Sequence, residues 1–465
     1  SEPEAALNGR QVYQPRGKGL GGSSTVNGMI WIRGNPMDFD NWAKLPGLES
    51  WKYANVLPYF KKAQGSRAGS HADLARGFAG PLTTTNGVMT NPLYNRFIEA
   101  AQQAGYPYRE DLNDGVQEGF GPLPMTVGDG VRQSSARAYL PHSRSNLRIL
   151  KHAQVTKVDV RDGKANAVEV KIGRRQITVD AAQEVILSAG SINSPQLLML
   201  SGIGEPNQLS KHGIGVVVES PGVGQNLMDH LEVYVQQACT EPLSLYKDLS
   251  HWGRIKIGLR WLYNQSGLGA TNHFEAGGFI RSSESQPYPD IQFHFLPAAM
   301  SYDGSSQAQQ HGYQAHVGPM LPQSRGEITL RSANPLQAPR IAFNYLSEAA
   351  DWQVFREAIR SARHIFSQPA MTSISGAELS PGAHEQTDAQ LDEFIRNHAE
   401  SAYHPCGTCR MGSDASAVVD PAGRVFGVDR LRVIDASIFP HITNGNLNAP
   451  TIMLAEKLAD AIKVG

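Results

Sequence analysis

The chain has 465 residues, of which 40% are hydrophobic and 18% charged, and its formal net charge at pH 7 is −1. These values are typical of a globular protein with one large or two medium domains, and the near-zero charge gives no support to nucleic-acid binding. Three cysteines exclude a disulfide-based scaffold, no apolar run is long enough to cross a membrane, and the N-terminus shows no signal-peptide pattern. We therefore expect a cytoplasmic protein, or one that contacts the inner membrane only peripherally.

Glycines dominate the first part of the chain. After a short extended segment over 9–16, residues 17–28 read Gly-Lys-Gly-Leu-Gly-Gly-Ser-Ser-Thr-Val-Asn-Gly. Gly17, Gly19 and Gly22 satisfy the spacing G-x-G-x-x-G, but a dinucleotide-binding turn also needs an apolar strand before it and a helix after it. The preceding residues are polar. We interpret the segment as a loop that comes close to a flat or phosphorylated ligand, with a plain surface loop as the alternative.

The middle of the chain predicts helices first and strands later. Helices are expected over 51–64 and 91–104, and strands over 147–150, 155–158 and 167–170.

A strand, a turn and a helix follow. Residues 184–188 form a short apolar run typical of a strand buried on both faces, residues 189–191 make the turn, and a helix begins near Ser194. This unit is the context in which a parallel sheet binds a cofactor at its carboxyl end.

The second half changes character at about residue 231. Strands are expected over 291–295 and 327–330, with amphipathic helices over 348–366 and 387–400. The sequence therefore predicts a mixed α/β fold in which an antiparallel sheet with helices is inserted between nucleotide-binding pieces. The predicted nucleotide-binding domain comprises 1–45, 142–230 and 404–465, and the predicted substrate domain comprises 46–141 and 231–403.

The last sixty residues contain several of the candidate catalytic and binding residues. A buried strand is expected over 431–435, and Asn448 is a good N-cap for a helix with Pro450 in its first turn. The N-terminus of such a helix presents free N–H groups and partial positive charge. Beside an electron acceptor, and with His404 nearby as a base, this end of a helix suits a site that oxidises alcohols.

Cys406 and Cys409 lie close to His404 and raise the question of a metal site. Tetrahedral zinc needs four ligands, and the only other cysteine, Cys239, is far away in the sequence. We therefore expect buried structural thiols and no metal.

Taken together, these segments resemble the glucose–methanol–choline (GMC) family of flavoprotein oxidoreductases. Residues 17–40 fit the family's first signature, residues 190–204 fit its second, and His404 and Asn448 fall at its catalytic pair. The likeness runs nearly end to end. The resemblance implies an FAD-binding Rossmann-like domain, hydride transfer to the flavin with His404 as base, and a hydrogen bond from Asn448 to the substrate oxygen.

The resemblance also implies a set of FAD-binding residues. They are Gly21, Gly22, Ser23, Asn27, Val155, Asp435, Ala436, Asn448, Pro450 and Thr451. Some relatives attach the flavin covalently through a histidine in the first signature. That position is Val26 here, which favours non-covalent FAD.

Within the family the chain is most similar to members that oxidise choline. The segments that carry this closer likeness are 271–281, 290–297, 402–409 and 445–451. A quaternary ammonium is bound by aromatic faces and a carboxylate, so Glu275 and Phe274 are candidates, with Trp261 and Tyr403 behind them. His294 is a further candidate. A surface ion pair for Glu275 and a structural role for His294 are nearly as plausible.

The expected reaction is oxidation of choline to betaine aldehyde, with electrons passed to a quinone-type acceptor of the respiratory chain. The family's first β-α-β unit is missing, which predicts poor FAD binding by this chain alone. The alternatives are oxidation of another aliphatic or aryl alcohol, a flavin-containing hydroxynitrile lyase, and an inactive truncated form.

Overall fold

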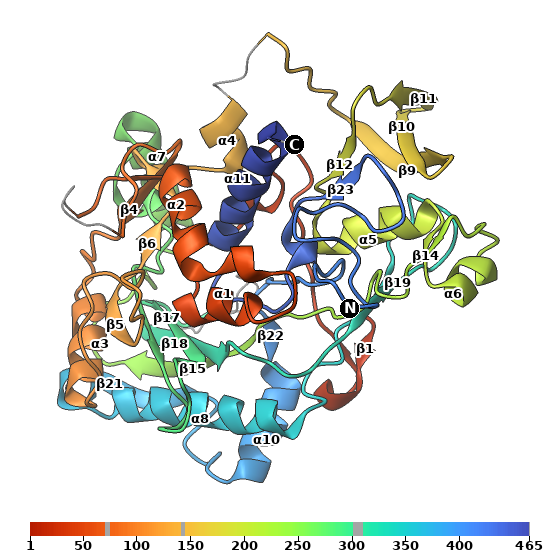
Figure 1. Ribbon diagram of the computed structural model, residues 1–465. Helices are drawn as coiled ribbons and strands as arrows, with labels where there is room; N and C mark the ends of the chain where they lie inside the picture. Colours follow the sequence, from red (N-terminus) through yellow and green to blue (C-terminus); the bar gives the residue numbers. More distant parts are fainter. Residues whose placement is uncertain (70–74, 141–144, 301–309, 465) are drawn as a thin grey trace.

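The computed structural model describes residues 1–69, 75–140, 145–300 and 310–464. Its larger part is an antiparallel sheet with helices around it, and its smaller part holds a parallel strand pair, a helix and a β-meander (Figure 1). The predicted mixed α/β architecture is confirmed. The predicted domain division stays a prediction, and its boundary at 141 and 142 and its last residue, 465, lie outside the described residues.

The helices of the described residues are α1 (Pro36–Trp42), α2 (Tyr53–Ala63), α3 (Pro92–Gln103), α4 (Ser135–Tyr139), α5 (Gly190–Leu200), α6 (Pro206–Lys211), α7 (His251–Asn264), α8 (Ala349–Phe366), α9 (Pro369–Thr372), α10 (Asp388–His398) and α11 (Asn448–Val464). The strands of the large sheet are β5 (Gly119–Pro122), β15 (Leu231–Cys239), β16 (Ala276–Ile280), β17 (Ile291–Leu296), β18 (Gly312–Pro319), β21 (Ser375–Ser380) and β22 (Glu400–Ser401). The other strands are β1 (Pro3–Glu4), β2 (Arg10–Gln11), β3 (Gln64–Ser66), β4 (Leu82–Asn86), β6 (Pro124–Met125), β7 (Val127–Gly128), β8 (Val131–Arg132), β9 (Ala153–Arg161), β10 (Lys164–Ile172), β11 (Arg175–Asp180), β12 (Val185–Leu187), β13 (Ile203–Gly204), β14 (Val218–Glu219), β19 (Glu327–Thr329), β20 (Arg340–Ala342) and β23 (Leu431–Val433).

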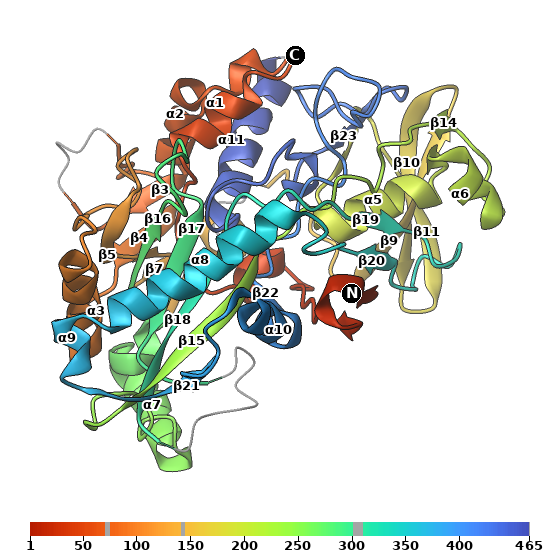
Figure 2. The same ribbon diagram turned by 90° about the horizontal axis from the view of Figure 1, so that it is seen from below.

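The large sheet has seven strands in the order β21-β15-β18-β17-β16-β5, with β22 also paired to β15. All of these pairs are antiparallel. Figure 2 shows α8 lying across one face of the sheet. On that side Phe295 stacks on Phe97 of α3, with ring centroids 4.4 Å apart, and also contacts Phe366 of α8.

The two faces of this sheet differ because successive strand residues point to opposite sides. Val233, Phe293 and Val317 belong to the apolar face under α8. The opposite face of the three central strands is polar. The side chains of this polar face, including the residue just before β15, are His230, Glu232, Tyr234, Gln292, His294, Gln314 and His316.

The smaller part of the fold contains the predicted strand, turn and helix. β12 pairs in parallel with β23, so the carboxyl ends of both strands meet at one edge. The Asp435 carboxylate, at the end of β23, accepts hydrogen bonds from Gly190 N (2.9 Å) and Ser194 Oγ (2.6 Å) of α5. α5 begins at Gly190, which adopts φ +82°, four residues before the expected start.

Two expectations about strands are wrong. Residues 147–150 alternate polar and apolar but form no strand, because they pair with no other strand among the described residues and their apolar side chains are exposed. β12 is buried on one face only, since Ile186 is exposed while Val185 and Leu187 are buried. Polar–apolar alternation predicts which face of a strand is buried, but a strand forms only where another strand pairs with it.

The glycine-rich loop does not follow the strand–turn–helix pattern of a dinucleotide-binding turn. β2, before it, pairs antiparallel with β1, and the loop ends in a short 3₁₀ turn over Gly22–Thr25. The loop folds back on itself, and a Cβ at Gly17 would collide with the carbonyl of Gly22. Glycine at this position is therefore required by close packing of the backbone.

Asp38 gives the fold a predictable pH dependence. Its carboxylate accepts hydrogen bonds from Asn35 N and Asn444 N, both at 2.8 Å, and burial raises its pKa from 3.8 to about 7. The unfolded chain therefore loses this proton at lower pH than the folded chain, so stability falls as pH rises from about 4 to about 7 and then levels off. An Asp38→Asn variant should lack this fall and gain up to about 4 kcal/mol relative to the parent at pH 8.5. Urea unfolding at pH 5 and pH 8.5 measures the difference, and an equal gain at both values would contradict it.

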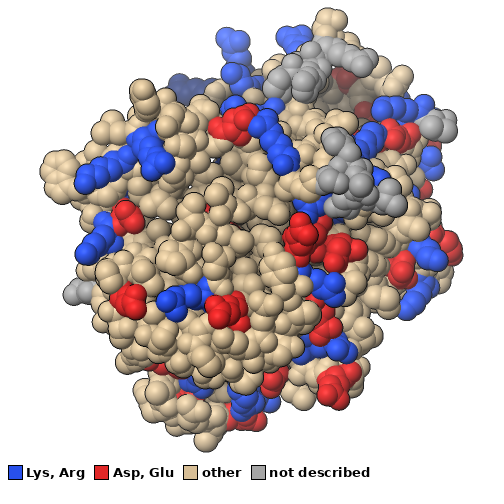
Figure 3. All heavy atoms as spheres, turned by 90° about the vertical axis from the view of Figure 1, so that its left-hand side faces the viewer, with Lys and Arg blue, Asp and Glu red and all other residues tan. Residues whose placement is uncertain are grey.

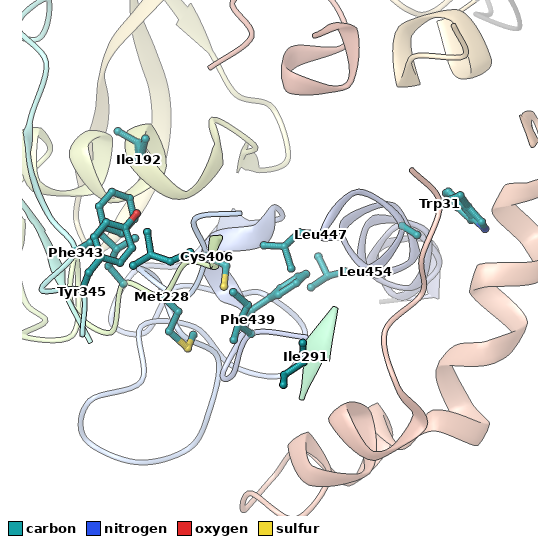
Figure 4. Packing of buried hydrophobic residues seen from close by; sticks show 14 of the residues in the cluster. Trp31, Ile192, Met228, Ile291, Phe343, Tyr345, Cys406, Phe439, Leu447 and Leu454 are labelled. Carbon is teal, nitrogen blue, oxygen red and sulfur yellow. The ribbon is translucent and has the colours of Figure 1, made fainter. Parts of the chain in front are cut away.

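Cys406 and Cys409 lie in the core, which confirms that these thiols are buried. Figure 4 shows Cys406 among apolar side chains, with Met228 and Phe439 close by. The backbones of Met228 and Cys406 exchange hydrogen bonds of 3.0 and 2.9 Å. Burial raises the pKa of both thiols well above the ordinary value.

Candidate active site

His404 is positioned through its backbone by a buried carboxylate. Asp229 Oδ1 accepts the His404 N–H at 2.7 Å, while Oδ2 accepts the hydroxyls of Ser401 and Tyr345, both at 2.5 Å. The residue before His404, Tyr403, adopts φ +63°, an uncommon conformation for a residue with a side chain. These contacts fix where the imidazole projects.

A chain of hydrogen bonds sets the tautomer of His404. His230 Nε2 lies 3.0 Å from the Met320 carbonyl oxygen, which can only accept, so His230 carries its proton on Nε2. Its Nδ1 is then an acceptor, and His404 Nδ1 lies 3.0 Å away. His404 therefore donates from Nδ1 and presents a lone pair on Nε2.

Both imidazoles are neutral near physiological pH. Burial lowers the pKa of His230 to about 3. Burial, with smaller effects from His230, His294 and Arg16, lowers the pKa of His404 well below its usual value. A neutral His404 with a free lone pair on Nε2 is the form that can accept a proton.

The amide that donates to His404 is that of Asn446, whereas the catalytic role predicted for Asn448 stays a prediction. Asn446 Nδ2 donates to His404 Nε2 at 3.2 Å. Its Oδ1 accepts from Gln292 Nε2 at 3.1 Å and lies 3.5 Å from His294 Nε2, which fixes the orientation of the amide. Asn448 is the first helical residue of α11, two residues after Asn446.

The polar face of the sheet extends from this amide to a buried carboxylate that sequence reasoning missed. Gln314 Oε1 accepts from Met300 N and Gln236 Nε2, so Gln314 Nε2 donates to His316 Nε2 at 2.6 Å. His316 must then donate from Nδ1 to Glu232 Oε1, at 3.0 Å.

Glu232 pairs with no lysine or arginine among the described residues. Its one ion-pair contact there is with His316, which accepts from Gln314 at Nε2 and donates to Glu232 from Nδ1. The Glu232 side chain is buried. The ring of Phe274 contacts two of the histidines of the polar face, with centroids 5.2 Å from that of His316 and 6.0 Å from that of His294.

Glu275, the predicted cation-binding carboxylate, is occupied elsewhere. Its Oε2 accepts the N–H of Met89 and its Oε1 accepts the hydroxyl of Thr271 at 2.7 Å. Phe274 and His294 contact each other at the polar face, and their predicted part in binding the substrate stays a prediction. Tyr403 contributes its backbone, since its N–H donates to Ser401 Oγ and its carbonyl accepts from Arg16.

The predicted cofactor-binding residues lie in two groups. In the first, Asn27 Oδ1 accepts from Arg132 at 2.8 Å beside the loop of Gly21, Gly22 and Ser23. In the second, Pro450 and Thr451 lie in the first turn of α11, with the Thr451 hydroxyl donating to Leu447 O at 2.7 Å.

Val155 lies apart from these groups, in a cavity of about 520 Å³ that runs along β12 from Glu184 to Ala189. Leu187, Ser188 and Ala189 also line this cavity. Apolar walls at the end of a parallel strand, beside the start of α5, suit the adenosine end of a dinucleotide. Asp435 binds α5 through its carboxylate, and the predicted approach of Asp435 and Ala436 to the pyrophosphate stays a prediction.

Comparisons with known proteins agree with this architecture. Models of the GMC oxidoreductase family match residues 4–232 and 322–455. The oxygen-dependent choline dehydrogenase of Brucella canis is 52% identical over 466 residues, which cover 99% of this chain and 84% of that protein.

Solved structures share the fold. Pyridoxine 4-oxidase from Mesorbium loti superposes with a TM-score of 0.90 and 30% identity, covering all of this chain and 88% of that chain. A variant of formate oxidase from Aspergillus oryzae RIB40, studied for its FAD modification, gives a TM-score of 0.92 at 26% identity, covering all of this chain and 90% of that chain. The chain belongs to the GMC oxidoreductase family of FAD-dependent enzymes.

Proposed function

We propose that this protein oxidises choline to betaine aldehyde with His404 as the base. The observation that carries the proposal is the hydrogen-bond chain from Met320 through His230 to His404, which leaves the Nε2 lone pair directed at Asn446. A substrate hydroxyl placed between these two groups would give its proton to His404 Nε2 and accept the Asn446 N–H. The 52% identity to choline dehydrogenases supports choline as the alcohol.

Proton removal matters because hydride leaves an alkoxide much more readily than an alcohol. Once His404 holds the proton, its Nδ1–H still donates to His230, while Asp229 holds its backbone N–H. Asn446 stabilises the negative oxygen, in the manner of an oxyanion hole. Bound FAD supplies the hydride acceptor, and the two groups around Asn27 and Thr451 are the residues that would hold it.

Glu232 is the group that would select a quaternary ammonium. A trimethylammonium cannot donate a hydrogen bond, so it is recognised by negative charge and by ring faces. The buried Glu232 carboxylate provides the negative charge. The rings of Tyr234 and Phe274, at the same polar face, provide the ring faces. Tyr234 and His316 have ring centroids 4.2 Å apart. The choline nitrogen would lie on this side of the site and its hydroxyl at His404.

An anaerobic spectrum of the FAD-loaded protein tests the proposal. Choline should bleach the oxidised flavin, and 3,3-dimethylbutan-1-ol, which has the same shape without the charge, should bleach it much more slowly. Equal rates would favour another primary alcohol as substrate. Flavin that stays oxidised with every alcohol would favour lyase chemistry and overturn the dehydrogenase proposal.

The electron acceptor can be assigned in the same assay. The name of the Brucella relative specifies oxygen, whereas the sequence resemblance implies a quinone-type acceptor. We propose a quinone, tested by comparing reoxidation of the reduced flavin by dissolved oxygen and by a soluble quinone. Faster reoxidation by oxygen would contradict this part of the proposal.

The two asparagines give a paired prediction. Asn446→Ala removes the donor to the substrate oxygen, so the rate of flavin reduction by choline should fall about 10²-fold. Asn448→Ala should leave this rate nearly unchanged, since the hydrogen bond to His404 comes from Asn446. Stopped-flow reduction of the FAD-loaded variants measures both. The opposite order would restore Asn448 as the catalytic amide.

A further inference from the structure

α7 carries a row of exposed apolar side chains that the chemistry at His404 does not use. At about 100° per residue, Trp252, Ile255, Leu259, Leu262 and Tyr263 fall within an arc of about 100° on one side of the helix. Trp252, Leu262 and Tyr263 are 72%, 73% and 90% exposed. None of the fourteen residues of α7 is buried. In Figures 1 and 2 the helix lies at the margin of the molecule.

The helix is nevertheless firmly attached to the protein by its other side. The Trp261 indole donates to the Gly130 carbonyl at 2.7 Å, and the Ser250 hydroxyl caps the first turn by accepting from Gly253 N. Five large apolar side chains held outward on an ordered helix form a patch of the kind that marks an interaction surface.

The charges beside the patch point to one kind of partner. α7 contains Arg254, Lys256 and Arg260 and no acidic residue. Lys256 and Arg260 flank the apolar row on one side and Arg254 on the other, by the same helical spacing. Arg254 and Arg260 donate to Leu249 O and Ser266 Oγ, so their charges are not neutralised by carboxylates in these contacts. Figure 3 shows the side of the molecule on which α7 lies, and Lys and Arg side chains project at the upper left of that picture.

We propose that α7 lies in the surface of an anionic membrane and anchors the protein there. An interfacial helix combines an apolar face with cations at its flanks, which is the pattern of α7. No helix in the described parts of the chain is long and apolar enough to cross a membrane. A second copy of the chain fits the patch less well, because a two-fold pair of antiparallel α7 helices would bring Lys256 close to Arg260 of the other copy.

Vesicle binding of the full chain tests the proposal. The protein should co-sediment with vesicles of phosphatidylcholine containing phosphatidylglycerol and bind pure phosphatidylcholine much more weakly. Lys256→Gln and Arg260→Gln together should lower the partition coefficient by about five-fold for each charge removed, and added salt should have the same effect. Equal binding to both vesicle types would overturn the electrostatic part of the proposal, and no binding would overturn it entirely.

A second set of variants locates the contact. Leu259→Asp with Leu262→Asp should lower the partition coefficient at least about tenfold. Val88→Asp is the control, since Val88 is even more exposed than Leu259 and Leu262 but lies outside α7, and it should bind as the parent does. Brominated lipid should quench the fluorescence of the parent, and less so that of Trp252→Phe.

The control for folding is flavin reduction by substrate, which should be the same in all these variants. A lipid-free dimer that the aspartate variants dissociate would assign the patch to a second copy and overturn the membrane proposal.

Discussion

His404→Gln should lower the rate of flavin reduction by choline by about 10²–10⁴-fold, the usual contribution of a general base. Glutamine can accept a hydrogen bond from the substrate hydroxyl but cannot hold its proton at neutral pH. The neutral state of His404 in the folded protein, caused by burial and by its neighbours, makes it the group ready to accept that proton. Stopped-flow reduction of the FAD-loaded variant under anaerobic conditions measures the effect.

His212→Gln is the matched control for this experiment. His212 is half-buried and its Nε2 lies 3.1 Å from the Leu330 carbonyl, away from the polar face. The control variant should bind FAD and reduce it at the parental rate. If His404→Gln were reduced as fast as the control, a different base would have to be assigned and the proposed mechanism would be wrong.

Glu232→Gln should raise the KM for choline by about 10- to 100-fold, because removal of one partner from a buried charge pair is costly. The neutral analogue 3,3-dimethylbutan-1-ol should be oxidised with a nearly unchanged KM, since it has no charge to lose. The ratio of kcat/KM for the two alcohols therefore isolates the electrostatic contribution of Glu232. The hydrogen bond to His316 is retained by the glutamine oxygen, so the fold should be preserved.

Glu275→Gln separates this prediction from a general effect of buried glutamates. The Glu275 carboxylate contacts Met89 N and the Thr271 hydroxyl, so its replacement should lower stability without changing the ratio between choline and its neutral analogue. A ratio that changes with Glu275 and not with Glu232 would return the cation site to the residue expected from sequence.

Local patterns in the sequence predicted most elements of this fold. The helices now seen as α2, α3, α8 and α10 were expected within a few residues of their observed ends, because each has an apolar stripe at helical spacing. The prediction of a strand over 147–150 was wrong because no other strand pairs with these residues.

The active site was less predictable because its residues meet only in three dimensions. His404 was found through a motif, but the choice between Asn446 and Asn448 depends on where α11 begins. Glu232 was missed because its significance comes from His316, 84 residues away on a neighbouring strand. A carboxylate in an apolar-looking strand gives no such signal by itself.

The burial of the cysteines has a consequence for chemical durability. Cys239, Cys406 and Cys409 are all buried, and burial raises the pKa of each thiol. Oxidants and alkylating reagents attack the exposed thiolate, so the native protein offers them almost no target. These thiols should therefore resist peroxide formed in the surroundings of the protein. Thiol labelling should then proceed only as the protein unfolds, so its rate measures how often the core around these three cysteines opens.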